Sequence, residues 1–280
     1  MVRLDVEGVR FSHGSKEILK GLDFSISNGE VVGILGQNGS GKTTLLNCIN
    51  TEYRPTSGRV AIADFSRESV DGDHDLGEIA DVRDFSDMER SRILSTVEQN
   101  SQQSFPFTVL ETVRMGRYSR TGMFDEDDEA ELDFLCRVMD EVGILGFSDR
   151  NINELSGGEW RRVMIAQALA QEPEVLLLDE PTLHLDINHQ FDLMDMCRRI
   201  VRDRNILIVI VTHDLQLAAR FCDRIIVMEH GKITASGTPK ETITPEMIRR
   251  VFHMRARVEY NEEIKGMSVF LIGKADRAGL

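Results

Sequence analysis

A glycine-rich stretch, GQNGSGKTT, carries the residue types and the spacing best suited to chemistry. Residues 36–43 fit the pattern G-x-x-x-x-G-K-[ST], directly after an apolar run and directly before a helical pattern. Backbone N–H groups of such a loop point at phosphate oxygens, and the dipole of the following helix adds positive potential. Lys42 is expected to reach the β- and γ-phosphates of a nucleotide, and the Thr43 hydroxyl to ligate Mg²⁺. The residues predicted to bind the nucleotide here are Gly36, Gln37, Asn38, Gly39, Ser40, Gly41, Lys42, Thr43 and Thr44.

Two acidic residues and a histidine follow other apolar runs and could complete this site. Asp179 ends the run EVLLLD and is placed to hold Mg²⁺ through its water shell, and Glu180 is close enough to orient an attacking water and accept its proton. His213 follows the run ILIVIVT. Parallel strands bring their carboxyl ends to one edge of a sheet, where α/β folds bind ligands, so His213 is expected to contact the γ-phosphate. The sequence therefore predicts hydrolysis of a nucleoside triphosphate.

Two adjacent glycines, Gly157 and Gly158, stand where the first turn of an amphipathic helix is expected. Glycine destabilises a helix interior by about 1 kcal/mol relative to alanine, so the pair requires a reason. Ser156 and Glu159 form the capping-box pattern S-x-x-E, which explains those two residues but not the glycines. A helix N-terminus without side chains suits the close approach of a phosphate. Since one nucleotide has one γ-phosphate, we predict two chains arranged head to tail, each closing the other's site.

The elements that must position these residues alternate between strands and helices. Continuous apolar runs, typical of strands buried on both faces of a parallel sheet, span 31–35, 174–179 and 206–212. Helical patterns follow from residue 42 onward, over 188–202 and over 214–221. Residues 1–27 alternate polar and apolar side chains, which indicates antiparallel strands, and residues 101–153 are rich in helical patterns. The predicted fold class is α/β: a P-loop NTPase core with a mainly parallel sheet, an N-terminal antiparallel β subdomain and an inserted α-helical subdomain.

The charge of the chain argues against a nucleic-acid partner. A net charge of −14 would repel a phosphate backbone, and no basic stripe is present. Much of the negative charge lies in residues 64–90, whose acidic side chains resemble a calcium loop. An EF-hand loop that begins at Asp71 would need glycine at its sixth position and glutamate at its twelfth, where this chain has Leu76 and Val82. We therefore interpret residues 64–90 as a solvated loop.

Cysteine usage and hydropathy bear on the compartment. The four cysteines lie far apart with no C-x-x-C pair, which argues against a zinc site and a disulfide framework. No apolar run approaches the ~20 residues that cross a bilayer. The first residues lack the apolar core of a signal peptide. We expect a chain that stays in the cytoplasm with its cysteines reduced.

Taken together, GQNGSGKTT, LSGGE, VLLLDEP, LHLD and VTHD resemble the motifs of the nucleotide-binding subunit of an ATP-binding cassette (ABC) transporter. The resemblance covers about residues 1–240 and implies a homodimer, an ATP sandwich that closes on binding ATP and reopens after hydrolysis. By position, Gln99 is similar to the Q-loop glutamine, which touches Mg²⁺ or the water, and Asp186 to the D-loop acid. The resemblance implies three catalytic residues, Glu180, His213 and Gln99. It implies Thr43, Gln99 and Asp179 as metal-binding residues, and Ser156, Gly157, Gly158, Glu159 and Asp186 as further nucleotide-binding residues.

Two further stretches, FPFTVLETVRMGRY and EPTLHLDINHQFDLMDM, are similar to those of ATPases that serve importers for iron–siderophore complexes, haem or cobalamin. In that group two ATPases dock beneath two integral-membrane permease subunits at the cytoplasmic face of the membrane, with an external substrate-binding protein. The resemblance implies a groove near residues 99–118 for a permease helix, lined by Phe105 and Phe107. The alternative is that these two aromatic residues belong to the core of the helical subdomain.

The chain departs from the family's pattern at three places. His13, in FSHG, stands where an aromatic residue that stacks on adenine is usual, and an imidazole stacks more weakly. The acidic insert at residues 64–90 is longer than usual. Leu183 and His184 stand where small residues are common in the D-loop, which bears on packing across the dimer.

The motifs leave one alternative function open. A soluble ABC ATPase of iron–sulfur cluster assembly would share all of them. DNA-repair ATPases interrupt the cassette with a coiled coil, translation factors usually carry two cassettes, and exporters usually fuse membrane helices to it, none of which this sequence shows. We expect one ABC ATPase domain over 1–280, with the α/β core and β subdomain in 1–100 and 154–240, the helical subdomain in 101–153 and a C-terminal extension in 241–280.

Overall fold

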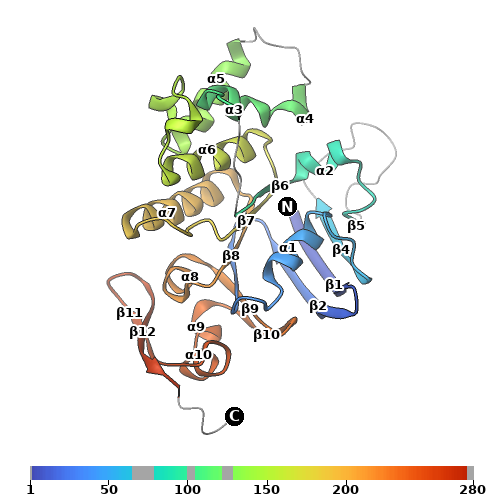
Figure 1. Ribbon diagram of the computed structural model, residues 1–280, viewed down its shortest axis with the longest axis vertical. Helices are drawn as coiled ribbons and strands as arrows, with labels where there is room; N and C mark the ends of the chain where they lie inside the picture. Colours follow the sequence, from blue (N-terminus) through green and yellow to red (C-terminus); the bar gives the residue numbers. More distant parts are fainter. Residues whose placement is uncertain (1, 65–78, 100–104, 122–128, 276–280) are drawn as a thin grey trace.

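A six-stranded sheet lies at the centre of the protein, in the order β10-β9-β3-β8-β7-β6 (Figure 1). The computed structural model describes residues 2–64, 79–99, 105–121 and 129–275. Neighbouring strands of the central sheet run parallel, except that β9 and β10 are antiparallel. The strands are β3 (Val31–Leu35), β6 (Leu94–Val97), β7 (Val175–Asp179), β8 (Leu207–Thr212), β9 (Arg224–Glu229) and β10 (Lys232–Gly237). The predicted α/β class with a mainly parallel sheet is confirmed.

Side chains along the central strands alternate between two hydrophobic cores, one on each face of the sheet. In β8, Ile208 and Ile210 belong to the core shared with the large helices, whereas Leu207, Val209 and Val211 belong to the core shared with α1 and the second sheet. Successive side chains of a strand point to opposite faces, so a strand covered on both faces must be apolar throughout. This double burial is why β3, β7 and β8 read as continuous apolar runs.

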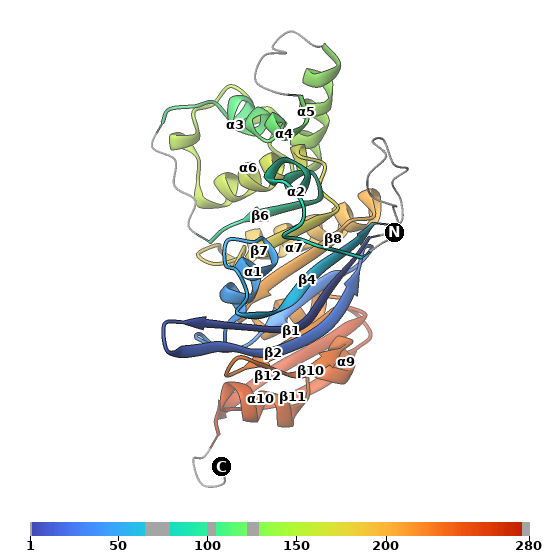
Figure 2. The same ribbon diagram turned by 90° about the vertical axis from the view of Figure 1, so that its right-hand side faces the viewer.

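A second, antiparallel sheet in the order β2-β1-β4-β5 covers one face of the central sheet (Figure 2). Its strands are β1 (Val2–His13), β2 (Lys16–Ser27), β4 (Ser57–Asp64) and β5 (Ala80–Asp81). Helix α1 (Lys42–Ile49) packs against β2 of this sheet and against β7 and β8 of the central one. The predicted antiparallel β subdomain is therefore present, and it holds α1 in place from the side opposite the central sheet.

Helices at one end of the molecule form a separate layer (Figure 2). They are α2 (Asp87–Ile93), α3 (Val109–Met115), α4 (Tyr118–Thr121), α5 (Glu129–Glu141) and α6 (Gly157–Ala170), with two 3₁₀ turns, η1 (Leu145–Phe147) and η2 (Ile152–Glu154). Helix α6 packs against α3 and α5. The helical layer therefore extends past residue 153, where the sequence-based division places the start of the core.

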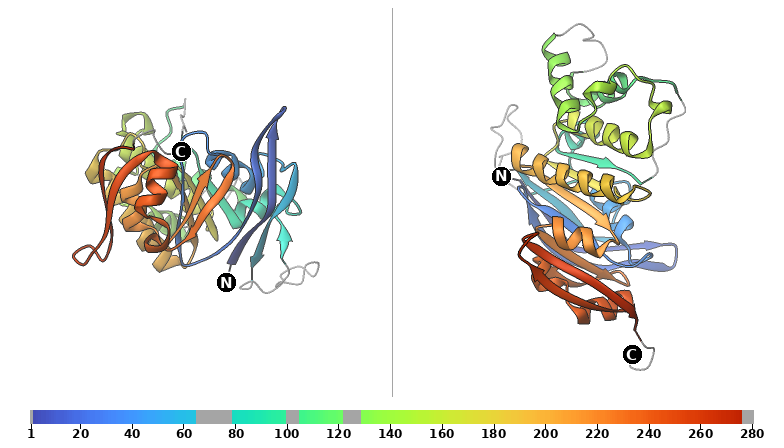
Figure 3. Two further views of the ribbon diagram at one scale, coloured as in Figure 1. Left: turned by 90° about the horizontal axis from the view of Figure 1, so that it is seen from below. Right: turned by 90° about the vertical axis from the view of Figure 1, so that its left-hand side faces the viewer.

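The remaining elements are helices α7 to α10 and the C-terminal strands β11 and β12. They are α7 (Ile187–Arg204), α8 (Leu215–Phe221), α9 (Pro239–Thr242), α10 (Pro245–Phe252), β11 (Met254–Asn261) and β12 (Gly266–Lys274). The strands β11 and β12 form an antiparallel hairpin whose β12 lies against α8 on the outside of the molecule (Figure 3). Helix α10 packs against β11.

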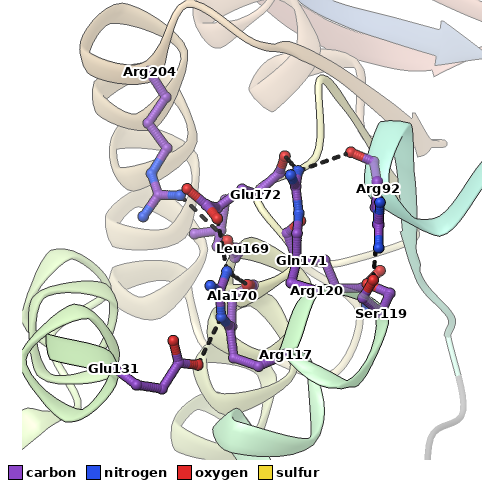
Figure 4. A network of polar contacts seen from close by, with 10 residues as sticks. All are labelled: Arg92, Arg117, Ser119, Arg120, Glu131, Leu169, Ala170, Gln171, Glu172 and Arg204. Atoms are coloured by element: carbon purple, nitrogen blue, oxygen red, sulfur yellow. Dashed lines mark hydrogen bonds and ion pairs between the residues drawn. The ribbon is translucent and has the colours of Figure 1, made fainter. Parts of the chain in front are cut away.

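Arginines fix the C-terminal end of α6 to its surroundings (Figure 4). Arg117 donates to Ala170 O at 3.0 Å, and Arg204 donates to Leu169 O at 3.2 Å. Arg120 donates to the carbonyls of the next two residues, Gln171 and Glu172, at 3.0 and 2.9 Å. The last carbonyls of a helix have no partner within it, so cations there satisfy them and interact favourably with the helix dipole. This end of α6 is anchored both to the helical layer and, through Arg204, to α7.

Residues 64–90 are not loop throughout, which corrects the interpretation as one solvated loop. Residues 65–78 lie outside the described residues, but Ala80 and Asp81 form β5 and pair with β4. Helix α2 begins after Ser86, whose side chain accepts from Glu89 N while Glu89 accepts from Ser86 N. This second S-x-x-E capping box was readable in the sequence. Among the described residues, no helix has the length and apolar character needed to cross a membrane.

Candidate functional site

The loop 36–41 reverses direction tightly between β3 and α1. Gly39 and Gly41 adopt φ angles of 81° and 103°, in the left-handed region that favours glycine. A Cβ on Gly36 would lie 2.4 Å from the backbone oxygen of Met228 and 2.6 Å from Ser40 Oγ. Gly41 caps α1 without a side-chain hydrogen bond, so the first N–H groups of that helix are left to other partners. The chain's own packing thus requires glycine at these positions and leaves helix N–H groups available for an anion.

Lys42 begins α1 and is almost completely buried. Its Nζ donates to Gly36 O at 2.8 Å and to Gln37 O at 3.2 Å. Burial lowers the pKa of Lys42, while the carboxylates of Glu180 and Asp179 act in the opposite direction. A buried cation held by neutral carbonyls and facing two carboxylates is suited to bind a polyanion.

Asp179, the last residue of β7, carries an oxygen suited to a metal ion. Burial raises the pKa of Asp179, and its hydrogen bond with Thr43 and the nearby cations Lys42 and Arg161 partly oppose that rise. Oδ1 of Asp179 is buried and finds no hydrogen-bond partner among the described residues. Buried polar atoms without a partner are rare and need an explanation. A carboxylate and a hydroxyl are hard oxygen donors of the kind that Mg²⁺ prefers, so Asp179 and Thr43 fit that ion.

Glu180 and His213 form a contact at the same edge of the sheet. His213 Nδ1 lies 3.0 Å from Glu180 Oε1 and 2.9 Å from Oε2. Glu180 is buried and adopts a φ of 46°, with its N–H donating to Val211 O at 2.9 Å. A left-handed backbone at a non-glycine residue costs of order 1–3 kcal/mol, and such residues cluster at functional sites. The turn after β7 therefore directs the Glu180 carboxylate to the imidazole that follows β8.

A cavity of about 350 Å³ brings many of the predicted residues together. Its lining residues are Asn38, Gly39, Gly41, Lys42, Thr43, Thr44, Gln99, Glu180, Leu183 and His213. Leu183, from the stretch LHLD, was noted in the sequence only as a departure from the family's pattern. The cavity lies at the carboxyl ends of β3, β7 and β8, which is the ligand-binding edge of an α/β sheet. The structure thus places the loop, the acid, the histidine and Gln99 around one space.

Arg161, which the sequence reasoning missed, contacts the edge of this site. Its guanidinium donates to the carbonyls of Glu98 and Gln99 at 2.8 and 3.0 Å. Burial lowers the pKa of Arg161, and the attraction of Asp179 opposes that effect. The sequence pattern that could have indicated it is EWRRV, with two adjacent arginines, Arg161 and Arg162. On a half-buried helix, one of two adjacent side chains points toward the protein interior.

The glycine pair begins α6, outside that cavity. Ser156 and Glu159 form the predicted capping box, with Ser156 N donating to Glu159 Oε2 at 2.7 Å and Glu159 N to Ser156 Oγ at 3.3 Å. A Cβ on Gly157 would meet no atom within 4 Å, and one on Gly158 would lie 3.6 Å from the His189 ring, an ordinary contact. Packing within the described chain therefore does not require glycine at either position.

Two other predicted residues also lie away from the cavity lining. Asp186 caps α7, with His189 N donating to its Oδ1 at 3.0 Å, and so lies beside the start of α6. His13 ends β1 in an exposed position at the hairpin turn. The structure brings Asp186 to the glycine pair, and His13 is not among the residues that line the cavity.

Comparisons with known proteins place these features in a family. The family model for ABC transporters matches residues 19–183. The cobalamin import ATP-binding protein BtuD of Halobacterium salinarum is 40% identical over 256 residues, which are 91% of this chain and 60% of that protein, so the chain spans three fifths of its length. The ferric enterobactin transport ATP-binding protein FepC of Escherichia coli is 33% identical over 92% of this chain and 90% of its own. The solved structure of cbiO1 from Clostridium perfringens, part of an ABC transporter complex, superposes with a TM-score of 0.71 at 30% identity and covers 88% of this chain and 92% of its own.

Proposed function

This chain belongs to the ABC transporter family as an ATP-hydrolysing subunit, and we propose that it energises the import of an iron–siderophore complex, haem or cobalamin. Relatives that are import ATP-binding proteins for cobalamin and ferric enterobactin support this substrate class. They also favour an importer over an ATPase of iron–sulfur cluster assembly. The single observation that carries the chemistry is the cavity that gathers Lys42, Glu180 and His213 at one sheet edge.

We assign the cavity to ATP and Mg²⁺. The phosphates would occupy the space above the N–H groups of loop 36–41 and the start of α1, beside Lys42. Asp179, Thr43 and Gln99 would hold Mg²⁺, which when bound neutralises phosphate charge. Glu180 would orient the attacking water and accept its proton, and His213 would contact the γ-phosphate from the position that its contact with Glu180 fixes.

We further propose that two copies of the chain share two ATP molecules. Gly157 and Gly158 have no reason within the described chain to be glycine, and Gly157, the first residue of α6, is exposed. A phosphate of the partner's ATP would supply that reason, with Ser156, Glu159 and Asp186 around it. The pair of ATPases would contact two permease subunits at the cytoplasmic face of the membrane, with a substrate-binding protein on the other side.

Of the two aromatic residues proposed to line the permease groove, one is exposed and the other is partly buried. Phe105 is 67% exposed, whereas Phe107 packs against the large hydrophobic core. Their ring centroids are 6.1 Å apart. We therefore propose Phe105 for the contact with a permease helix, whereas the partly buried Phe107 fits the alternative that it supports the core.

A mixed dimer tests the shared sites. Lys42→Ala damages the chain's own loop, whereas Gly158→Asp places a negative side chain at the start of α6. Each variant alone should be nearly inactive. In the mixture, the damaged loop faces the damaged α6 start within one site, and the second site keeps an intact loop from one chain and intact glycines from the other. ATP-dependent crosslinking between cysteines placed across the dimer should therefore recover on mixing.

The result that contradicts sharing is equally clear. If the glycines served their own chain's nucleotide, both sites of the mixed dimer would be damaged, and mixing would restore no crosslinking. Each variant alone is the control, because neither contains an intact site under the shared arrangement. Circular dichroism spectra of both variants verify that the chains are folded.

A further inference from the structure

Two adjacent arginines on α6 contact different parts of the molecule. Arg161 donates through Nη1 and Nη2 to the carbonyls of Glu98 and Gln99. Arg162 Nη1 donates to Val142 O, just past the end of α5, at 2.8 Å. Both arginines are half-buried. The helix therefore directs one guanidinium toward residues 98 and 99 and the next toward the end of α5 and toward α7.

The peptide that Arg161 binds leads into the cavity. Strand β6 ends at Val97 beside β7, residues 98 and 99 follow it, and Gln99 lines the cavity. The guanidinium is a planar fork, so two bonds to successive carbonyls fix both the distance and the direction of this peptide. Asp179, at the end of β7, attracts the same guanidinium. Arg161 is thus bonded to the peptide that carries Gln99.

Arg161 also shares a helix face with the glycine pair. Gly157 and Arg161 are four residues apart in α6, and side chains at that spacing lie on one face, about one helical turn apart. The intervening turn is regular helix whose N-terminus is closed by the Ser156–Glu159 capping box. A shift of the first turn of α6 would therefore move the Arg161 backbone relative to the two carbonyls that its guanidinium binds.

We propose that Arg161 is a positioning residue that sets the place of Gln99 in its own chain's cavity according to the position of the α6 N-terminus. The inference rests on the proposed function, in which the glycine pair meets the partner's ATP and Gln99 serves the chain's own Mg²⁺ site. A nucleotide against Gly157 then fixes the position of the first turn of α6, and Arg161 transmits that position to residues 98 and 99. Arg161 is therefore the residue through which the start of α6 acts on Gln99 in its own chain.

The test compares Arg161→Met, Arg161→Lys and the matched control Arg162→Met in the full chain. Methionine keeps an apolar stem and removes every donor, and lysine keeps the charge but loses the fork. Misplacement of a reacting group by about 1 Å lowers rates by up to about a hundred-fold, so kcat of Arg161→Met should fall by about ten-fold or more. The KM for ATP should change little, because the loop and Lys42 are intact. The Mg²⁺ concentration that gives the half-maximal rise in melting temperature in the presence of ATP should increase.

Arg162→Met separates positioning from the general anchoring of α6. It should lower the melting temperature without changing kcat or the Mg²⁺ dependence, and Arg161→Lys should have a kcat between those of the wild type and Arg161→Met. A wild-type kcat and Mg²⁺ dependence in Arg161→Met would overturn the proposal, as would an equal loss in Arg162→Met. Should Arg161→Met fail to fold, the kcat of Arg161→Lys decides, and a wild-type value overturns the proposal. A wild-type chain without Mg²⁺-dependent ATPase activity would instead contradict the proposed function.

Discussion

The starts of α1 and α6 both contain glycines, but the two regions keep them for different reasons. At α1, a Cβ on Gly36 would collide with the backbone of Met228, and Gly39 and Gly41 need left-handed φ angles. At α6, a Cβ on Gly157 would meet open space. The first group of glycines is required by the fold of one chain, whereas the second is required by nothing that the described chain contains.

The surroundings of the two helix starts differ in the same way. Lys42, Glu180 and His213 converge on the start of α1 within one cavity. The start of α6 has its own capping box, an ion pair between Arg150 and Glu159, and the neighbouring residues Asp186 and His189. The region that holds both a binding cation and a candidate base contains the groups that react, whereas a bare helix terminus can only add contacts to a ligand held elsewhere. We therefore assign the chemistry to the start of α1, and to the start of α6 a contact with a nucleotide that is held elsewhere.

The largest effect should come from the reacting region. Glu180→Gln keeps the size of the side chain but removes the base, so hydrolysis should fall by about a hundred-fold or more while ATP binding is retained. The variant should accumulate as an ATP-bound dimer, measured by gel filtration with ATP. Glu246→Gln, on the exposed first turn of α10, is the control and should hydrolyse ATP normally. A monomer that binds ATP without dimerising would count against the assignment of Glu180.

Gly36→Ala tests whether the fold of the single chain requires the glycines at α1. The added Cβ would lie 2.4 Å from a backbone oxygen that cannot rotate away, and overpacking of this kind costs about 1–3 kcal/mol. The free energy of unfolding of the nucleotide-free chain, measured by denaturant titration, should fall by about that amount. Gly146→Ala is the matched control, since a Cβ there meets no atom within 4 Å. If the two variants were equally stable, the fold of the single chain would not require glycine at position 36.

Much of the reacting region could be predicted from the sequence because its signals are local. The loop 36–43, the acids at the end of β7 and His213 after β8 each follow a short apolar run, and parallel strands bring such ends to one edge. The contact between Glu180 and His213 could not be read in this way. This contact depends on the left-handed φ of Glu180, which no pattern in the sequence predicts.

Other features depend on contacts between distant segments. Arg161 bonds to a peptide more than sixty residues earlier in the chain, and the spacing of the sequence gives no sign of which of two adjacent arginines does so. Strand β6 (Leu94–Val97) is short and contains serine and threonine, so it lacked the apolar run that revealed its neighbours. The boundary of the helical layer was displaced because α6 packs on α3 and α5. Sequence periodicity defines a helix but not the layer to which it belongs.

Gly157→Ala should have the smallest effect on the stability of the single chain. Alanine loses less backbone entropy in a helix than glycine does, and the space around Gly157 is open, so the nucleotide-free chain should gain up to roughly 0.5 kcal/mol of stability. If a partner's phosphate approaches that backbone, the added methyl group crowds it. ATP-dependent dimerisation should then weaken by about ten-fold, the equivalent of about 1.4 kcal/mol.

For Gly157→Ala, we expect the stability of the nucleotide-free chain to rise and its ATP-dependent dimerisation to weaken. Denaturant titration without nucleotide reports on the single chain, and sedimentation at several protein concentrations with ATP reports on the dimer. Gly146→Ala serves again as the control and should change neither quantity, because it lies in η1, far in sequence from both helix starts. A loss of stability in the nucleotide-free Gly157→Ala chain would show that the glycine serves its own fold, as Gly36 does. Unchanged dimerisation would show that no ligand approaches the start of α6.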